Sequence, residues 1–178
     1  MAHKEQMQFV QAVRKMFPHL FAGKRVLEIG SLNINGTVRG FFEDCFYRGL
    51  DVVQGECVDE VCWAHEHRGG PYDVIISCES LEHDPFWRQT LEHLPKLLVP
   101  WGLLIITAAG PKRKEHGTHR SSPESSGTTQ TDYGDHYRNM DASDLISGLG
   151  LSSAGWKYKI SYGRAKRDIY LWAVRDGA

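Results

Sequence analysis

The chain has 178 residues, which fits one domain (1–178) with a full hydrophobic core. Its 41% hydrophobic and 24% charged residues are ordinary for a globular protein, and they exclude collagen-like, disordered and coiled-coil chains. Lys and Arg number 21 against 22 Asp and Glu, a net charge of -1. Because no overall charge attracts polyanions, we expect no membrane partner, and no nucleic-acid partner outside a local basic patch.

The chain contains four cysteines, Cys45, Cys57, Cys62 and Cys78. They form no C-x-x-C pair and no zinc-finger spacing with histidines, which favours reduced thiols. The first ten residues carry Lys4 and Glu5 where a signal peptide needs its apolar stretch, and no apolar run reaches the length of a membrane span. We therefore expect a cytoplasmic protein.

The predicted elements alternate between helices and short apolar strands. Apolar residues at helical spacing over 9–17 predict an amphipathic helix that Pro18 ends, within an N-terminal helical region 1–21. Residues 25–29 (RVLEI) indicate a buried parallel strand that runs into a turn at Gly30. Further parallel strands are predicted at 47–53, 58–62, 74–78 and 103–108.

Three more helices are predicted at 37–44, 85–98 and 142–149. Asp84 is placed to cap the second of them, with Pro85 in its first turn. Strands that alternate with helices indicate a parallel α/β sheet. Two adjacent β-like runs, 154–162 and 168–174, predict an antiparallel hairpin at the end of the chain.

The end of the first predicted strand carries a glycine-containing motif. Glu28, Gly30 and Ser31 are followed by Asn35 and Gly36. Glycines let a backbone approach a ligand closely, and an acidic strand end can interact with a cationic group. The segment resembles the first motif of class I S-adenosylmethionine-dependent methyltransferases, with Leu and Ile in place of two of the family's glycines.

Further features follow in the order of that family. Asp51 stands 23 residues after Glu28 at the end of the second strand, where an acid in doubly wound folds pairs with ribose hydroxyls. Trp63 and Ala64 follow the third strand, where the family contacts adenine. Residues 72–83 (YDVIISCESLEH) are similar to the family's fourth-strand motif, and PWGLLII after Val99 resembles its turn into the fifth strand.

This resemblance implies a Rossmann-like class I methyltransferase sandwich, mostly parallel with a C-terminal antiparallel hairpin. It implies S-adenosyl-L-methionine as the cofactor, held by Glu28, Gly30, Ser31, Asn35, Gly36, Asp51, Trp63, Ala64 and Glu79. The fourth strand ends in CESL rather than the D/N-P-P-Y motif that clamps a flipped base, which argues against methylation of a base amino group.

Candidates for the chemistry follow the fourth strand. His83 and Asp84 stand where the family presents the methyl group, and a base there would take the proton of an alcohol acceptor. The alternative for His83 is a packing role. His116 is a third candidate. We expect no metal, because carboxylates at ligand spacing are not evident beside the loop histidines.

The polar stretch 109–140 is too long for an ordinary connection, which is typical of a functional or mobile loop. We expect it to be mobile without acceptor and to form the acceptor side of the site, with Arg120, Tyr137 and Asn139 as contacts. The alternative is a solvated loop without acceptor contact. The stretch is similar to the loop of a methyltransferase subgroup associated with glycans.

The sequence therefore predicts an S-adenosylmethionine-dependent O-methyltransferase acting on a sugar or another small polar hydroxyl compound. One alternative is a methyltransferase that acts on protein or RNA through the basic span 112–120. Another is a cofactor-binding protein of the same fold without transfer activity. The oligomeric state is left open.

Overall fold

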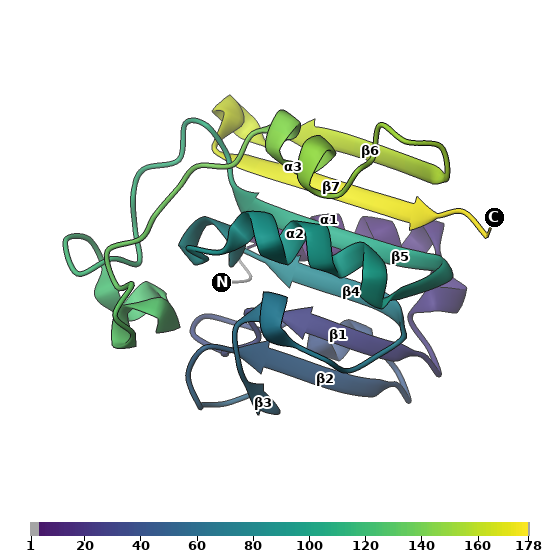
Figure 1. Ribbon diagram of the computed structural model, residues 1–178, viewed down its shortest axis with the longest axis horizontal. Helices are drawn as coiled ribbons and strands as arrows, with labels where there is room; N and C mark the ends of the chain where they lie inside the picture. The colour runs from purple at the N-terminus through teal and green to yellow at the C-terminus, as the bar shows by residue number, and fades with distance from the viewer. Residues whose placement is uncertain (1–3, 178) are drawn as a thin grey trace.

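The computed structural model describes residues 4–177, which form a seven-stranded sheet with helices on both faces (Figure 1). The strand order is β3-β2-β1-β4-β5-β7-β6. The strands are β1 (Arg25–Ile29), β2 (Phe46–Asp51), β3 (Glu60–Val61), β4 (Tyr72–Cys78), β5 (Leu98–Ala109), β6 (Trp156–Tyr162) and β7 (Asp168–Arg175).

Strands β1 to β5 pair in parallel, whereas β7 runs antiparallel between β5 and β6. The expected parallel sheet with a C-terminal antiparallel hairpin is confirmed. The chain winds outward from β1 in both directions, through β2 on one side and β4 on the other. A crevice at the carboxyl ends of the strands is expected at such a reversal of strand order.

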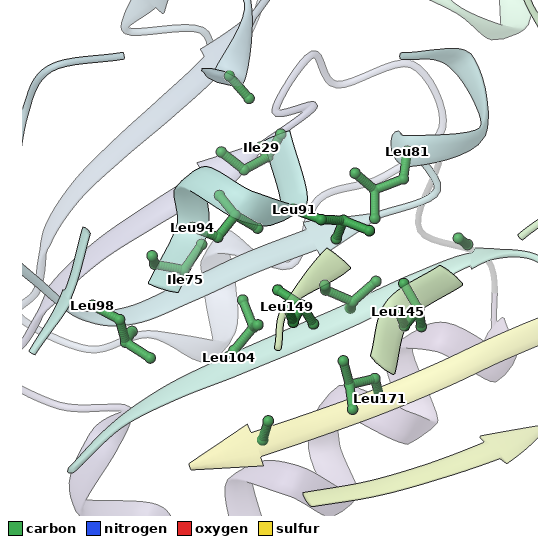
Figure 2. Packing of buried hydrophobic residues seen from close by; sticks show 14 of the residues in the cluster. Ile29, Ile75, Leu81, Leu91, Leu94, Leu98, Leu104, Leu145, Leu149 and Leu171 are labelled. Atoms are coloured by element: carbon green, nitrogen blue, oxygen red, sulfur yellow. The ribbon is translucent and has the colours of Figure 1, made fainter. Parts of the chain in front are cut away.

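Two helices, α2 (Trp87–Leu97) and α3 (Ala142–Gly148), cover one face of the sheet (Figure 1). Figure 2 shows Leu91 and Leu94 of α2 above the sheet residues Ile75 and Leu104, all within one buried cluster. Leu145 of α3 belongs to the same cluster. Each buried leucine contributes about 1.5–3 kcal/mol through the hydrophobic effect, so these contacts fix both helices on the sheet.

Helix α1 (Lys4–Met16) covers the opposite face, where Val10 and Val13 are fully buried. The predicted stop is confirmed, because the helix ends before Pro18 and a short 3-10 turn (Pro18–Leu20) follows. Residues 1–3 of the predicted region 1–21 lie outside the described residues. Across residues 4–177, each helix is too short or too polar to cross a bilayer.

The helix predicted at 37–44 was wrong. Only a 3-10 turn, Arg39–Phe41, forms there. The backbone of Glu43 is used in a bridge to Ala22, and the Phe42 ring stacks on Phe21 with centroids 4.6 Å apart. Tertiary pairing and aromatic packing therefore override the local pattern in a connection that already contains glycines and β-branched residues.

The start of α2 also differs from the prediction. The cap residue is Phe86 rather than Asp84. Asp84 still supports the first turn, because its carboxylate accepts hydrogen bonds from the Phe86 amide (2.7 Å) and the Thr90 hydroxyl (2.5 Å). This bonding anchors the chain where it leaves the β4 end and enters the helix.

Candidate functional site

A cavity that is partly open to solvent lies at the carboxyl ends of the parallel strands. Its walls come from the segments that follow β1, β2, β3 and β4, together with residues 125–128 of the long loop. Figure 1 shows that loop, drawn in green, beyond the arrowheads of β1 and β4. A pocket in this position is where doubly wound sheets bind their ligands.

The turn after β1 brings the ends of two neighbouring strands together. Gly30 has a φ of +73°, and a Cβ on it would lie 2.4 Å from the Cβ of Ser80 after β4. The amides of Gly30 and Ser31 both donate to the carbonyl of Leu50 at 2.9 Å. Only glycine fits this close approach, so the turn forms a narrow, bare-backbone floor for the cavity.

Asp51 lines the cavity at the end of β2. Its Oδ2 accepts a hydrogen bond from the Leu32 amide (3.1 Å) and its Oδ1 from the Val52 amide (2.8 Å). Burial raises the pKa of this carboxyl, while the backbone N–H groups oppose the shift. These donors fix the direction of the carboxylate and leave part of its capacity to accept hydrogen bonds for a ligand.

An aromatic group adjoins the cavity beyond β3. Trp63 and Ala64 both line the cavity. The Trp63 ring meets Phe86 edge-on at 5.2 Å between centroids and Tyr133 at 5.7 Å. Because Tyr133 belongs to the long loop, this ring contact connects the loop to the β3 end of the site.

The segment after β4 places three buried polar residues, Glu79, His83 and Asp84, on the cavity wall. His83 is 4% exposed, and neither of its ring nitrogens has a hydrogen-bond partner among the described residues. Burial, with a smaller contribution from neighbouring His116, lowers the pKa of His83 to about 3. The imidazole is therefore neutral at physiological pH.

The long loop folds over the outer side of His83. The ring of His116 lies 5.0 Å from that of His83, and the ring of Tyr137 lies 5.6 Å from it. A Cβ on Gly117 would lie 2.6 Å from Cε1 of His83. His116 and Tyr137 are thus brought to His83 but are not part of the cavity lining.

Four of the expected cofactor residues do not line the cavity: Glu28, Ser31, Asn35 and Gly36. Glu28 is buried beneath the turn and accepts a hydrogen bond from the Tyr47 hydroxyl at 2.8 Å. Burial raises the pKa of Glu28 to about 7, with the Tyr47 hydrogen bond opposing the shift. Ser31 is also buried, whereas Asn35 and Gly36 are at least partly exposed in the connection from β1 to β2.

Two of the expected acceptor contacts are bonded within the loop itself. Arg120 pairs with Glu115 at 3.1 Å and donates to the Asp135 carbonyl at 3.1 Å. The Asn139 amide donates to the carbonyl of Arg113 at 2.8 Å, which joins the two ends of the loop. Neither side chain lines the cavity.

The cavity also contains residues that the sequence analysis did not name as ligand contacts. Leu32, Ile34 and Val52 supply apolar surface, and residues 125–128 form a wall from the loop. The hydroxyl of Ser126 accepts from the Thr128 amide at 3.2 Å and caps the short turn Gly127–Gln130. The Ser-Gly-Thr sequence signals such a turn, but not its position against β2.

Neither a protein-family model nor a curated protein matches the sequence. Solved structures do match. A Burkholderia thailandensis 1,6-didemethyltoxoflavin-N1-methyltransferase, solved with S-adenosylhomocysteine, is 17% identical with a TM-score of 0.63, over 96% of this chain and 78% of that one. The N-methyltransferase NodS of Bradyrhizobium japonicum, also solved with S-adenosylhomocysteine, is 15% identical with a TM-score of 0.61, over 98% and 88%. The chain has the Rossmann-like methyltransferase fold.

The same methyltransferase fold occurs in a third similar structure, the [4+2]-cyclase SpnF, which is 14% identical with a TM-score of 0.59 over 97% of this chain and 82% of that one. At these identities the likeness concerns the fold. Activity has to be argued from the site itself.

Proposed function

We propose that this protein is an S-adenosylmethionine-dependent methyltransferase that methylates a hydroxyl group of a sugar or another small polar molecule. The observation that carries the proposal is the cavity, which Gly30, Asp51 and His83 all line. It lies at the reversal of strand order, where doubly wound sheets bind their ligands. Two structures of the same fold contain S-adenosylhomocysteine.

The cavity residues fit this cofactor. The bare backbone at Gly30 leaves room that a Cβ would fill, and the oriented carboxylate of Asp51 can accept hydrogen bonds from ribose hydroxyls. Trp63 and Ala64, with the apolar side chain of Leu32, offer surfaces for the adenine ring. When bound, S-adenosylmethionine supplies a methyl group activated by its sulfonium charge.

The acceptor side follows from the residues after β4. Glu79, His83 and Asp84 give this wall buried polar groups, which suit a small polar acceptor. The neutral imidazole of His83 can accept a hydrogen bond from an acceptor hydroxyl and hold its oxygen in line for transfer. With a pKa of about 3, His83 is a weak base, so its contribution is to orient the hydroxyl rather than to retain its proton.

Calorimetry with S-adenosylhomocysteine tests the cofactor part of the proposal. We expect the wild type to bind and Asp51→Ala to lose about 1–3 kcal/mol of binding free energy, because a buried polar partner is left unpaired. Asp132→Ala, a change of an exposed loop acid, serves as the matched control. Absence of binding to the folded wild type would overturn the proposal.

Turnover with a panel of small acceptors tests the reaction. Release of S-adenosylhomocysteine would be measured with hydroxyl compounds, including sugars, and with matched amines. Faster release with the hydroxyl compounds supports the proposal, and release with amines alone contradicts it.

A cofactor-binding protein without transfer is the second candidate. It is favoured by the likeness to the cyclase SpnF and by the weak basicity of His83. Tight binding of S-adenosylhomocysteine without turnover on any acceptor would establish it. A macromolecular acceptor is less well supported, because Arg113 and Arg120 of the basic span already pair with Asp168 and Glu115.

A further inference from the structure

Three side chains converge beside the cavity. Glu82 and His83 lie in the turn after β4 (Leu81–His83), and His116 reaches them from the long loop. One potential ligand atom from each residue lies within 4.8 Å of the other two. We propose that Glu82, His83 and His116 bind a divalent transition-metal ion.

Two of the three residues are buried with polar atoms that no protein group satisfies. Glu82 is fully buried and His83 is 4% exposed. Neither carboxylate oxygen of Glu82 and neither ring nitrogen of His83 has a hydrogen-bond partner within residues 4–177. The amides of Glu82 and Ala109 lie near the carboxylate but do not reach it in hydrogen-bond geometry. A cation would satisfy atoms that are costly to leave unpaired.

His116, the third residue, has one ring nitrogen bonded to a backbone carbonyl, as metal-ligating histidines commonly do. Nδ1 of His116 lies 3.1 Å from the carbonyl of Lys114, so it carries the proton and leaves Nε2 to bind a metal. The Tyr137 ring packs against the His116 ring at 5.1 Å and its hydroxyl donates to the same Lys114 carbonyl at 3.1 Å. His116 is thereby held toward the pair after β4.

A second cluster of potential metal ligands differs from the first, because its polar atoms already have hydrogen-bond partners. Glu60, Cys62 and His67 also have ligand atoms within 4.8 Å of one another. There, however, His67 bonds Glu60 and the Tyr72 hydroxyl, each at 2.9 Å, and the Cys62 thiol donates to Glu60 at 3.4 Å. These atoms already have partners, so this cluster needs no ion.

The ligand types indicate the class of metal. Two imidazoles and one carboxylate suit Zn²⁺, Mn²⁺, Fe²⁺ or Co²⁺, whereas Mg²⁺ and Ca²⁺ prefer sets made of oxygen. The neutral imidazole of His83 is the form that binds metals. Burial, with a smaller contribution from neighbouring Glu79, raises the pKa of the Glu82 carboxyl, and a divalent ion bound there would displace its proton.

Three protein ligands leave open coordination positions, and His83 borders the cavity. With the ion bound, the lone-pair nitrogen of His83 would hold the metal, so the ion rather than the imidazole would orient the acceptor hydroxyl. The bound hydroxyl would lose its proton to water more readily. Its oxygen would then bond the methyl carbon of S-adenosylmethionine while the carbon–sulfur bond breaks, leaving S-adenosylhomocysteine. This use of the ion depends on the proposed function, but binding of the ion does not.

The test measures metal binding by the full chain without cofactor. Purified protein is stripped with a chelator and titrated with Zn²⁺ against a chromophoric chelator, and Co²⁺ absorption reports the ligand set. We expect about one equivalent of Zn²⁺ to bind. His116→Ala and Glu82→Gln should each weaken Zn²⁺ binding by more than about tenfold, because loss of a residue that merely orients a metal ligand already has an effect of that size.

Two variants and one separate measurement make the result decisive. His119→Ala removes an exposed histidine of the same loop, and Cys62→Ser disables the second cluster; both should keep wild-type Zn²⁺ affinity. No binding to the folded wild type, or binding lost in Cys62→Ser but kept in His116→Ala, overturns the proposal. Calorimetry with S-adenosylhomocysteine on His116→Ala tests the cofactor site separately. Cofactor binding that is kept while the metal proposal fails would leave the proposed function intact.

Discussion

Gly127 lies against the carboxylate of Asp51: a Cβ on this glycine would come within 2.9 Å of Oδ1 and within 2.7 Å of Cγ2 of Val53. The long loop therefore packs against Asp51 after β2 as well as against His83 after β4. If the ribose of the cofactor binds Asp51, as we propose, the loop forms one wall of the cofactor site in addition to the acceptor site.

The first prediction tests this contact. Gly127→Ala should weaken S-adenosylhomocysteine binding by about 1–3 kcal/mol, because the added methyl group overpacks the turn against Asp51 and shifts one of them. Gly40→Ala is the control, since a Cβ there meets no atom within 4 Å. Calorimetry on both variants decides the matter. Equal affinities of the two folded variants for S-adenosylhomocysteine would show that the loop does not form a wall of the cofactor site.

The second prediction concerns Glu28 and pH. Its folded-state pKa of about 7 lies above its ordinary value of 4.5, so between these values the folded protein keeps a proton that the unfolded chain releases. The free energy of unfolding must therefore fall as pH rises through this window, by about 3 kcal/mol for this group alone.

Glu28→Gln removes this titration while keeping an acceptor for the Tyr47 hydroxyl. Relative to the wild type, the variant should gain about 2–3 kcal/mol of stability between pH 4.5 and pH 7.5. Urea unfolding at both pH values measures the difference. A difference between variant and wild type that stays constant with pH would mean that Glu28 is not buried with a raised pKa.

The sheet was predictable because its strands are short and buried. A strand of a parallel sheet is buried on both faces, so it is apolar at nearly every position, as residues 74–78 are. Such a short continuous apolar run is typical of a buried strand. The connection after β1 was not predictable, since its backbone pairs with Ala22, a contact that no local pattern encodes. Asp51 could be predicted as a site residue because its distance from Glu28 along the chain places it at the end of the second strand.

The other half of the site depends on how the loop folds back. Residues 125–128 and His116 are far from β2 and β4 in the sequence, and only tertiary packing brings them to Asp51 and His83. Glu82 gave no signal beyond its resemblance to a family motif. Its burial without hydrogen-bond partners is visible only in three dimensions.

The third prediction separates turnover from cofactor binding at His83. His83→Ala should lower turnover by about 10²-fold, the scale of losing a contact that positions the acceptor oxygen for transfer. Affinity for S-adenosylhomocysteine should change little, because the cofactor is proposed to be held by Gly30, Asp51 and Trp63 rather than by His83. Near-normal turnover in this variant would make His83 a packing residue, and Asp84 would be tested next.

The last prediction concerns Tyr137, whose hydroxyl donates to the Lys114 carbonyl while its ring packs against His83 and His116. Tyr137→Ala removes both contacts and should raise the acceptor KM by about tenfold, equivalent to 1.4 kcal/mol, while cofactor affinity is kept. Tyr137→Phe keeps the ring but frees the Lys114 carbonyl that also orients His116. It should therefore raise KM less than Tyr137→Ala does, and steady-state kinetics with calorimetry would measure both effects. An unchanged acceptor KM in Tyr137→Ala, with S-adenosylhomocysteine affinity reduced instead, would assign this part of the loop to the cofactor rather than to the acceptor.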